Sequence, residues 1–339
     1  MNEILDQFKY LSVSRFEVVL QSQTEAILPA LIGSTLRGAF GHALKAISCS
    51  VEHQDCEKCL LSEACLYPTV FEPTSIGKTK DIPRPFIFEP PIPPLTREIS
   101  EHQTLKLRVA EKGKISFGLT LIGETVRKLP YFIYAFELMA RHGLGANRQS
   151  FSVSEVFQID LNNSKNLIYA PNFLKILPFQ ETNLAEIVRK RLNLIELTQH
   201  LQIQFQTPLR IRRNRELLEK ITFGEIFKQC SLRLKFLSEN YGTPLEYDYQ
   251  TLTKNAETVS TISDKLWKHE FSRRSNSQNK NYDLDGMLGE IVFRTDDFSE
   301  FIPFIAACEF LHIGSASNLG LGHFSFGSRT NIFLGQNNF

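Results

Sequence analysis

The sequence has no long apolar run and no surplus of charge of either sign. No stretch approaches the roughly 20 apolar residues of a membrane-spanning helix, and the first residues, MNEILDQFKY, lack the basic and apolar regions of a secretory signal. The 38 basic and 37 acidic side chains give a net charge of +1, which neither indicates nor excludes a nucleic-acid partner. We therefore expect a cytoplasmic protein with no membrane partner, in which thiols stay reduced.

Cysteine is scarce, but four of the six cysteines are close together: Cys49, Cys56, Cys59 and Cys65. Their spacing, C-x6-C-x2-C-x5-C, with a C-x2-C core, is typical of a tetrahedral zinc site in a reducing compartment. Thiolates also hold iron–sulfur clusters, and a cysteine-rich loop without metal is the remaining alternative. We expect a structural zinc ion that fixes an insertion and takes no part in chemistry.

The order of the expected elements predicts one fold unit that occurs twice. A chain of 339 residues is long enough for two domains. In the first half we expect strands, helices and an insertion in the order β-α-β-β-α-β, with strands at 10–20 and 151–160 and a helix at 33–48. Between them we expect two strands joined by the turn EKGK at 111–114, followed by a second helix that closes on Gly143. In the second half we expect strands at 201–212, 284–294 and 319–327 and helices at 222–242 and 298–314.

This order is that of the ferredoxin-like fold. We therefore predict an α+β protein with two tandem ferredoxin-like (RRM-like, βαββαβ) domains and a four-cysteine insertion in the first. The first domain spans 1–160 with the insertion at 49–65, a connecting segment spans 161–198, and the second domain spans 199–330.

A glycine-rich segment, GSASNLGLGHFSFG, follows the last expected helix. It is not a dinucleotide fingerprint, because that motif follows a strand and precedes a helix. Its backbone N–H groups, at Gly314, Ser315, Gly320 and Gly322, could approach a phosphate closely. The alternative is a plain turn between a helix and a strand.

Four stretches of the chain resemble one known family. They are STLRGAFGHALKAISC with the cysteines and the VFEP that follow, TPLRIRRNRELLEKITFGEIFKQCSLRLKFLSENYG, SRRSNSQNKNYDLDGMLGEIVFRTDDFSEFIPFIAACEFLHIG and NLGLGHFSFG. In this order they resemble the CRISPR-associated repeat-processing endoribonucleases of the RAMP superfamily, in the subset with a cysteine-bearing N-terminal half. Members usually read close to H-V-G-K-x-T-T-x-G-L-G in the last loop. Here the loop is HIGSASNLGLG, in which the Lys and both Thr are replaced.

The resemblance implies cleavage of precursor CRISPR RNA within its repeats, with no cofactor for the cut. Metal-free RNA cleavage uses the ribose 2′-OH as nucleophile, and leaves a 2′,3′-cyclic phosphate and a 5′-hydroxyl. It needs a base, an acid and a positive charge near the phosphorane. The partners implied are CRISPR repeat RNA and other CRISPR effector subunits. The alternative is a non-catalytic RNA-binding subunit of an interference complex.

His42 is the first candidate for the acid or base. The family's catalytic histidine is often on or near the first helix, and His42 lies roughly 155° from the apolar face of the helix at 33–48. Lys45, three residues on, could stabilise the phosphorane, and Tyr10 could orient the hydroxyl. His312 and His323, on either side of the glycine-rich segment, are the next candidates. An ordinary surface or helix-end histidine is the alternative in each case.

Clusters of basic residues mark the expected RNA contacts. Arg37 could reach a phosphate from the helix at 33–48. The other candidates are Arg210, Arg212, Arg213, Arg215, Trp267, Lys268, Arg273 and Arg274. Arginine and lysine would bind phosphates and Trp267 would stack on a base. The alternative for these clusters is an ordinary solvated surface.

Overall fold

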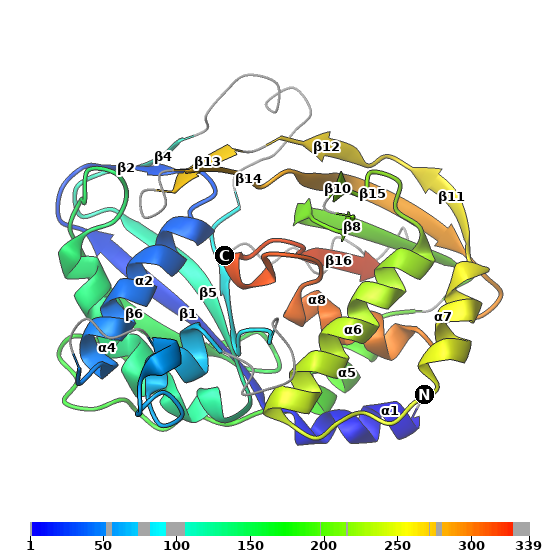
Figure 1. Cartoon of the computed structure of the whole chain (residues 1–339), viewed down its shortest axis with the longest axis horizontal. Helices are drawn as coiled ribbons and strands as arrows, with labels where there is room; N and C mark the ends of the chain where they lie inside the picture. The colour runs from blue at the N-terminus through cyan, green and yellow to red at the C-terminus, as the bar shows by residue number, and fades with distance from the viewer. Residues whose placement is uncertain are drawn as a thin grey trace.

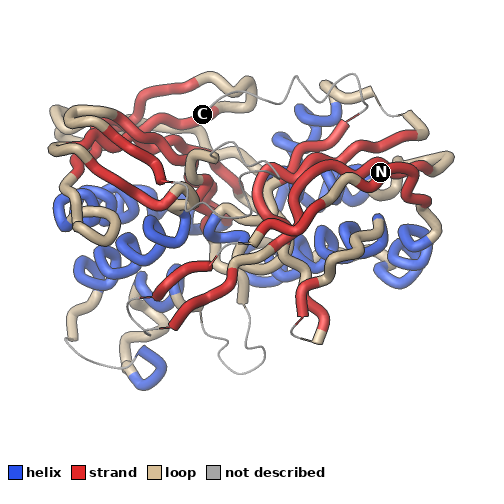
Figure 2. The backbone as a smooth tube through the Cα atoms, turned by 90° about the horizontal axis from the view of Figure 1, so that it is seen from above, coloured by secondary structure: helices blue, strands red, loops and turns tan. Residues whose placement is uncertain are grey.

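The computed structural model describes residues 2–51, 56–73, 82–92, 106–196, 198–214, 216–270, 272–275 and 280–327. These residues form two halves, each with its own antiparallel sheet and its own apolar core. Figure 1 shows the halves side by side, and Figure 2 shows their strands as two adjacent groups. Among the described residues, no helix is both long and apolar enough to cross a membrane.

The first half contains a five-stranded sheet in the order β3-β5-β1-β6-β7. Its strands are β1 (Val13–Ser22), β3 (Phe86–Glu89), β5 (Lys114–Ile122), β6 (Phe151–Ile159) and β7 (Lys165–Tyr169). Neighbouring strands are antiparallel throughout. β1 and β3 are joined through a helix, and β5 inserts between them, which is the split βαβ arrangement of the ferredoxin-like fold.

Two helices, α2 (Gly33–Ser48) and α4 (Leu129–His142), cover this sheet. They meet at Phe40, whose ring lies 4.9 Å from that of Phe132 and 5.2 Å from that of Phe136. Aromatic rings of β3 extend the same cluster toward the sheet. As expected from the sequence, α4 ends at Gly143, which has φ of +86° and so adopts a conformation that favours glycine.

The second half repeats this topology with a four-stranded sheet in the order β11-β15-β8-β16. Its strands are β8 (His200–Leu209), β11 (Ser260–Asp264), β15 (Gly286–Arg294) and β16 (Phe324–Gly327). Its helices are α6 (Phe223–Tyr241), α7 (Tyr249–Glu257) and α8 (Ile302–Leu311). β8 leads through α6 and α7 to β11, and β15 lies between them, as β5 lies between β1 and β3. The duplication predicted from the element order is therefore confirmed.

The chain begins against the second half. Side chains of α1 (Asn2–Gln7) and of the short helix η1 (Phe8–Tyr10) are part of the second core. So are side chains of α5 (Leu184–Leu192), which follows β7 and begins with an Asn183–Glu186 capping box. Figure 1 shows α1 and α5 together beside the other helices of this half.

Several short elements were not expected from the sequence. The expected hairpin around Lys112 does not form, because β4 (Lys106–Val109) pairs with β2 (Ala26–Pro29) instead of β5. The polar stretch at 243–282 contains α7, β11 and β12 (Trp267–His269), together with the pair β13 (Ser272–Ser275) and β14 (Lys280–Asp283). The remaining short elements are η2 (Cys56–Lys58), η3 (Tyr67–Phe71), η4 (Gly123–Lys128), η5 (Ser317–Leu319), β9 (Arg212–Arg213) and β10 (Glu216–Leu217).

Candidate functional site

Helix α2 presents His42 to solvent. Its apolar side chains Leu36, Phe40 and Leu44 are buried against the sheet and α4. His42 is exposed on the opposite face, where the neighbouring Ala46 is exposed as well. The position of the imidazole follows from the helical period, and its exposure allows a ligand to approach it.

Two cations of α2, Lys45 and Arg37, are held over aromatic rings. The Lys45 ammonium lies 5.3 Å from the Tyr67 ring centroid, and the Arg37 guanidinium lies 4.5 Å from that of Phe71. The Phe71 ring can lie against α2 because residue 41 is glycine; a Cβ at Gly41 would overlap the ring. Lys45 and Arg37 are half-buried. Lys45 lies one turn from His42, whereas Arg37 points about 140° away from it around the helix axis.

Tyr10 lies apart from this group. The sequence placed it at the start of a strand, but the strand begins at Val13 and Tyr10 belongs to η1. η1 packs against α1 and α5, whereas α2 packs against α4, β3, η3 and η5. Tyr10 is exposed and carries the Lys9 ammonium over its ring. Its distance from α2 follows from the docking of the first residues onto the second half.

His312 and His323 stack on each other inside the second half. Their ring centroids are 4.7 Å apart and their planes differ by 10°. His312 is 1% exposed, its Nδ1 has no hydrogen-bond partner among the described residues, and burial lowers its pKa well below the ordinary value. His323 is half-buried, and burial lowers its pKa too. His312 is thus closed off from any RNA, contrary to the expectation for an acid or base.

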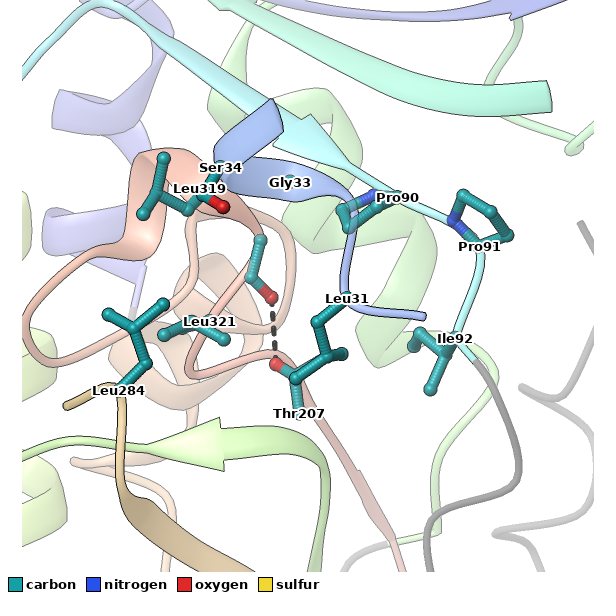
Figure 3. A pocket seen from close by; sticks show the side chains of 11 residues that line it. Leu31, Gly33, Ser34, Pro90, Pro91, Ile92, Thr207, Leu284, Leu319 and Leu321 are labelled. Carbon is teal, nitrogen blue, oxygen red and sulfur yellow. Dashed lines mark hydrogen bonds between the residues drawn. The ribbon is translucent and has the colours of Figure 1, made fainter. Parts of the chain in front are cut away.

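The glycine-rich segment is closed as well. The N–H groups of Ser315, Gly320 and Gly322 donate to the carbonyls of Arg210 (2.8 Å), Ser317 (3.0 Å) and Pro208 (3.1 Å). A Cβ at Gly314 would lie 2.7 Å from the Arg210 carbonyl oxygen. The phosphate-binding role expected for Gly314, Ser315, Gly320 and Gly322 therefore has no donors at three of these positions. Figure 3 shows that the segment lies directly against the start of α2.

The basic residues of the second half occupy different environments. Arg210 is buried, and its Nε donates to the Asp285 carbonyl at 2.8 Å, so it fixes backbone. Arg212 and Arg213 are exposed on β9, where Arg213 pairs with Glu225.

Farther along the chain, Lys268 is exposed and lies 3.5 Å from both Glu219 and Glu270. Trp267 is half-buried, edge-on to His269 at 5.6 Å. Arg273 and Arg274 lie on β13, where only the backbone is described, and Arg215 lies outside the described residues.

The four cysteines surround the end of α2 without forming a ready-made metal site. All four are reduced and half-buried. The Cys49 thiol donates to the Val51 carbonyl at 3.0 Å, and the Cys65 thiol donates to the Ser48 carbonyl at 3.6 Å. Cys49, Cys59 and Cys65 line a hollow of about 560 Å³. Within the described ranges, no three His, Cys, Asp or Glu side chains are placed to hold one metal ion.

Glu89 is a polar residue of this region that the sequence did not indicate. It ends β3, and its carboxylate accepts a hydrogen bond from Thr120 Oγ1 at 2.6 Å. Its charge also favours the protonated form of His323, which belongs to the other half of the molecule. Nothing in the short strand FIFE points to this electrostatic effect on His323, because it arises only where the halves meet.

Two family models match the chain. The model AF_1859_N, described as an N-terminal domain, matches residues 11–180, which is half of the chain. The model for the CRISPR-associated endoribonuclease Cas6 matches residues 203–324. An uncharacterized protein of Archaeoglobus fulgidus is 22% identical over 301 residues, covering 88% of this chain and 92% of its own.

Solved structures share the fold. The product complex of Thermus thermophilus Cas6 has a TM-score of 0.53 and 14% identity, and the match covers 92% of this chain and 98% of that one. A partial Cas6-RT-Cas1–Cas2 complex has a TM-score of 0.56 and 11% identity, covering 94% of this chain and 46% of that one. These likenesses support the tandem ferredoxin-like fold.

Proposed function

The chain belongs to the Cas6 family of CRISPR-associated endoribonucleases, with an AF_1859-type N-terminal domain, and we propose that it cuts precursor CRISPR RNA within its repeats by attack of a ribose 2′-OH, without metal. The products are a 2′,3′-cyclic phosphate and a 5′-hydroxyl. The observation that carries this proposal is the exposed imidazole of His42 on α2.

His42 is the acid or base in this proposal. Its imidazole reaches solvent from a rigid helix that is packed on both a sheet and a second helix. Histidine suits proton transfer to or from a ribose hydroxyl or a leaving 5′-oxygen near neutral pH. His312 fails the same test, because a buried ring cannot approach a phosphodiester.

Lys45 supplies positive charge near the phosphorane. It lies one helical turn from His42, so the two side chains are neighbours on the surface of α2. The ammonium rests on the Tyr67 ring, which limits its motion without neutralising its charge. A charge held in place in this way needs little reorganisation when the transition state forms.

Exposed cations of the second half bind the RNA backbone. Arg212, Arg213 and Lys268 are exposed on the short strand β9 and on β12, and β13 carries Arg273 and Arg274. Contacts of this kind set affinity and its dependence on salt, and the repeat sequence is read by other contacts with the bases.

Cleavage of a repeat RNA in EDTA tests the proposal. Purified protein should cut the RNA at one position and leave a cyclic phosphate. Binding without a cut would favour the alternative, a non-catalytic RNA-binding subunit. The observation in favour of that alternative is the closed glycine-rich segment, whose N–H groups bond within the protein. In that case the partners are other subunits of a CRISPR complex, as they are for the structural neighbour in the Cas6-RT-Cas1–Cas2 complex.

Zinc binding by Cys49, Cys56, Cys59 and Cys65 stays a prediction. Two of the thiols donate hydrogen bonds to carbonyls, and binding would require all four to lose their protons and converge. Zinc would then join the end of α2 to the turn at 56–65. Elemental analysis of the native protein tests this, and the absence of metal would remove the prediction.

A further inference from the structure

We propose that the glycine-rich segment positions α2, and with it His42, against the RNA-binding second half. Two groups of residues form the contact, which we call the glycine joint. Gly33, Phe88 and Pro90 come from the first half, and Thr207, Leu319 and Gly320 come from the second half. This inference rests on the proposed function, because it gives the joint a role in cleavage. It replaces the expected phosphate contact with a contact inside the protein.

The first part of the joint is the start of α2. A Cβ at Gly33 would lie 3.0 Å from the carbonyl carbon of Leu319 and would overlap its oxygen. Only glycine therefore permits this approach of two backbones. The Leu319 carbonyl, with its partial negative charge, lies at the positive end of the α2 dipole, which favours the contact electrostatically.

The second part of the joint is the end of β3. A Cβ at Gly320 would lie 2.7 Å from the Phe88 carbonyl oxygen and would overlap Pro90. Gly320 has φ of +88°, so a side chain there is also strained. Its carbonyl accepts a hydrogen bond of 2.7 Å from Thr207 Oγ1, drawn in Figure 3. Thr207 Oγ1 in turn accepts from the His323 N–H at 2.9 Å, which ties the segment to the second sheet.

The joint is closely packed and apolar. Leu31, Pro91 and Ile92 surround it from one side, and Leu284 and Leu321 from the other. The cavity between the two sides is about 10 Å³, enough for one water molecule at most. Such a contact transmits displacement instead of absorbing it.

His42 lies nine residues beyond Gly33 on the same helix, or roughly 13 Å along its axis. A shift at the joint therefore moves His42 relative to any RNA that the second half holds. A misplacement of about 1 Å can lower a reaction rate by about 100-fold. The joint fixes the distance between His42 and the RNA that the second half holds, and Gly33 and Leu319 are therefore positioning residues.

The test compares Gly33→Ala with Thr35→Ser, a small change two residues farther along α2, where the side chain is half-buried and does not line the cavity of the joint. Two quantities are measured for each: the dissociation constant for repeat RNA, and the single-turnover cleavage rate at saturating RNA. Gly33→Ala should lower the rate by about 100-fold and leave the dissociation constant within about twofold, while Thr35→Ser matches the wild type in both. An unchanged rate in Gly33→Ala overturns the inference, and so does a proportional loss of affinity.

A second variant covers the case in which Gly33→Ala does not fold. Thr207→Val keeps the shape of the side chain and removes both hydrogen bonds of the hydroxyl, so it should lower the rate in the same way. Hydrogen exchange gives a reading without RNA: amides of α2 near Gly33 should exchange faster in both variants. Unchanged hydrogen exchange in both variants overturns the inference, whether or not the wild-type protein cuts RNA. A wild-type protein that cuts no RNA contradicts only the proposed function.

Discussion

The imidazole of His312 stacks on that of His323 at 4.7 Å, although the two residues belong to opposite ends of one glycine-rich loop. His312 has φ of +54° and ends α8, and His323 precedes β16. The stack therefore holds the loop closed at its base. It also places two titratable groups where charge is poorly solvated.

This arrangement predicts loss of stability in mild acid. Burial lowers the pKa of both His312 and His323. For His312 the charges of His323, Arg233 and Arg15 lower the pKa further, while Glu89 partly opposes the shift at His323. Below about pH 6.5 both histidines bind a proton in the unfolded chain, whereas in the native state they stay neutral until the pH is lower. The free energy of unfolding should fall as pH falls, by up to about 1.4 kcal/mol per pH unit for each histidine. Urea unfolding at a series of pH values measures this slope.

The control for this slope is His312→Asn, because asparagine tolerates positive φ. The variant should show a shallower decline of stability between about pH 6.5 and pH 5. Parallel curves for the variant and the wild type would show that the stacked pair does not set the acid sensitivity.

The second prediction concerns the ion pair between Arg191 of α5 and Glu309 of α8. Arg191 Nε lies 2.5 Å from Glu309 Oε2, and its Nη2 also donates to the Phe326 carbonyl at 2.6 Å. The two side chains are only 16% and 10% exposed. Arg191→Ala leaves a buried carboxylate alone, so the free energy of unfolding should fall by about 3–5 kcal/mol.

Arg189 of the same helix is the matched control. It pairs with Asp6, but both side chains are at least half exposed. Arg189→Ala should change the free energy of unfolding by less than about 1 kcal/mol. Equal losses in the two variants, measured by urea unfolding, would contradict the role of burial.

The third prediction separates chemistry from binding. His42→Ala should lower the cleavage rate by about 10²- to 10⁴-fold, the usual worth of a general acid or base. The dissociation constant for repeat RNA should change little. His142→Ala, at an exposed position at the end of α4, should leave the rate unchanged. A His42→Ala protein that cuts at the wild-type rate would transfer the role to another residue.

The fourth prediction concerns the two arginines of β9. Arg212→Ala should weaken RNA binding for all sequences and reduce the slope of log affinity against log salt by about 1. Arg213→Ala should have a smaller effect, because Arg213 already pairs with Glu225. Filter binding at several salt concentrations measures both slopes. Equal slopes for Arg212→Ala and the wild type would remove Arg212 from the RNA contacts.

Periodic patterns were sufficient to predict the main elements of the fold. The helix at 33–48 has the bounds that the apolar spacing predicted, and α4 and α6 end at Gly143 and Gly242 as expected. One of the strands that were not predicted has little apolar pattern. β11, STISD, is mostly exposed and lies at the edge of its sheet, so its sequence carries no alternation to detect.

The site was less predictable, because it depends on contacts between distant residues. The exposure of His42 follows from its own helix, and the sequence was enough to infer it. The burial of His312 and Arg210 depends on how the loop packs against β8 and α2, which no local pattern records. The same holds for Tyr10, whose place follows from the docking of α1 onto α5.

Single 2′-deoxy substitutions through a repeat RNA test the central claim most directly. If the ribose 2′-OH is the nucleophile, one such substitution should abolish cleavage, while the dissociation constant stays within about twofold of that for the unmodified RNA and cleavage of the other substituted RNAs persists. Cleavage of every substituted RNA at the unmodified rate would contradict the account, because no hydroxyl of the substrate would then be needed.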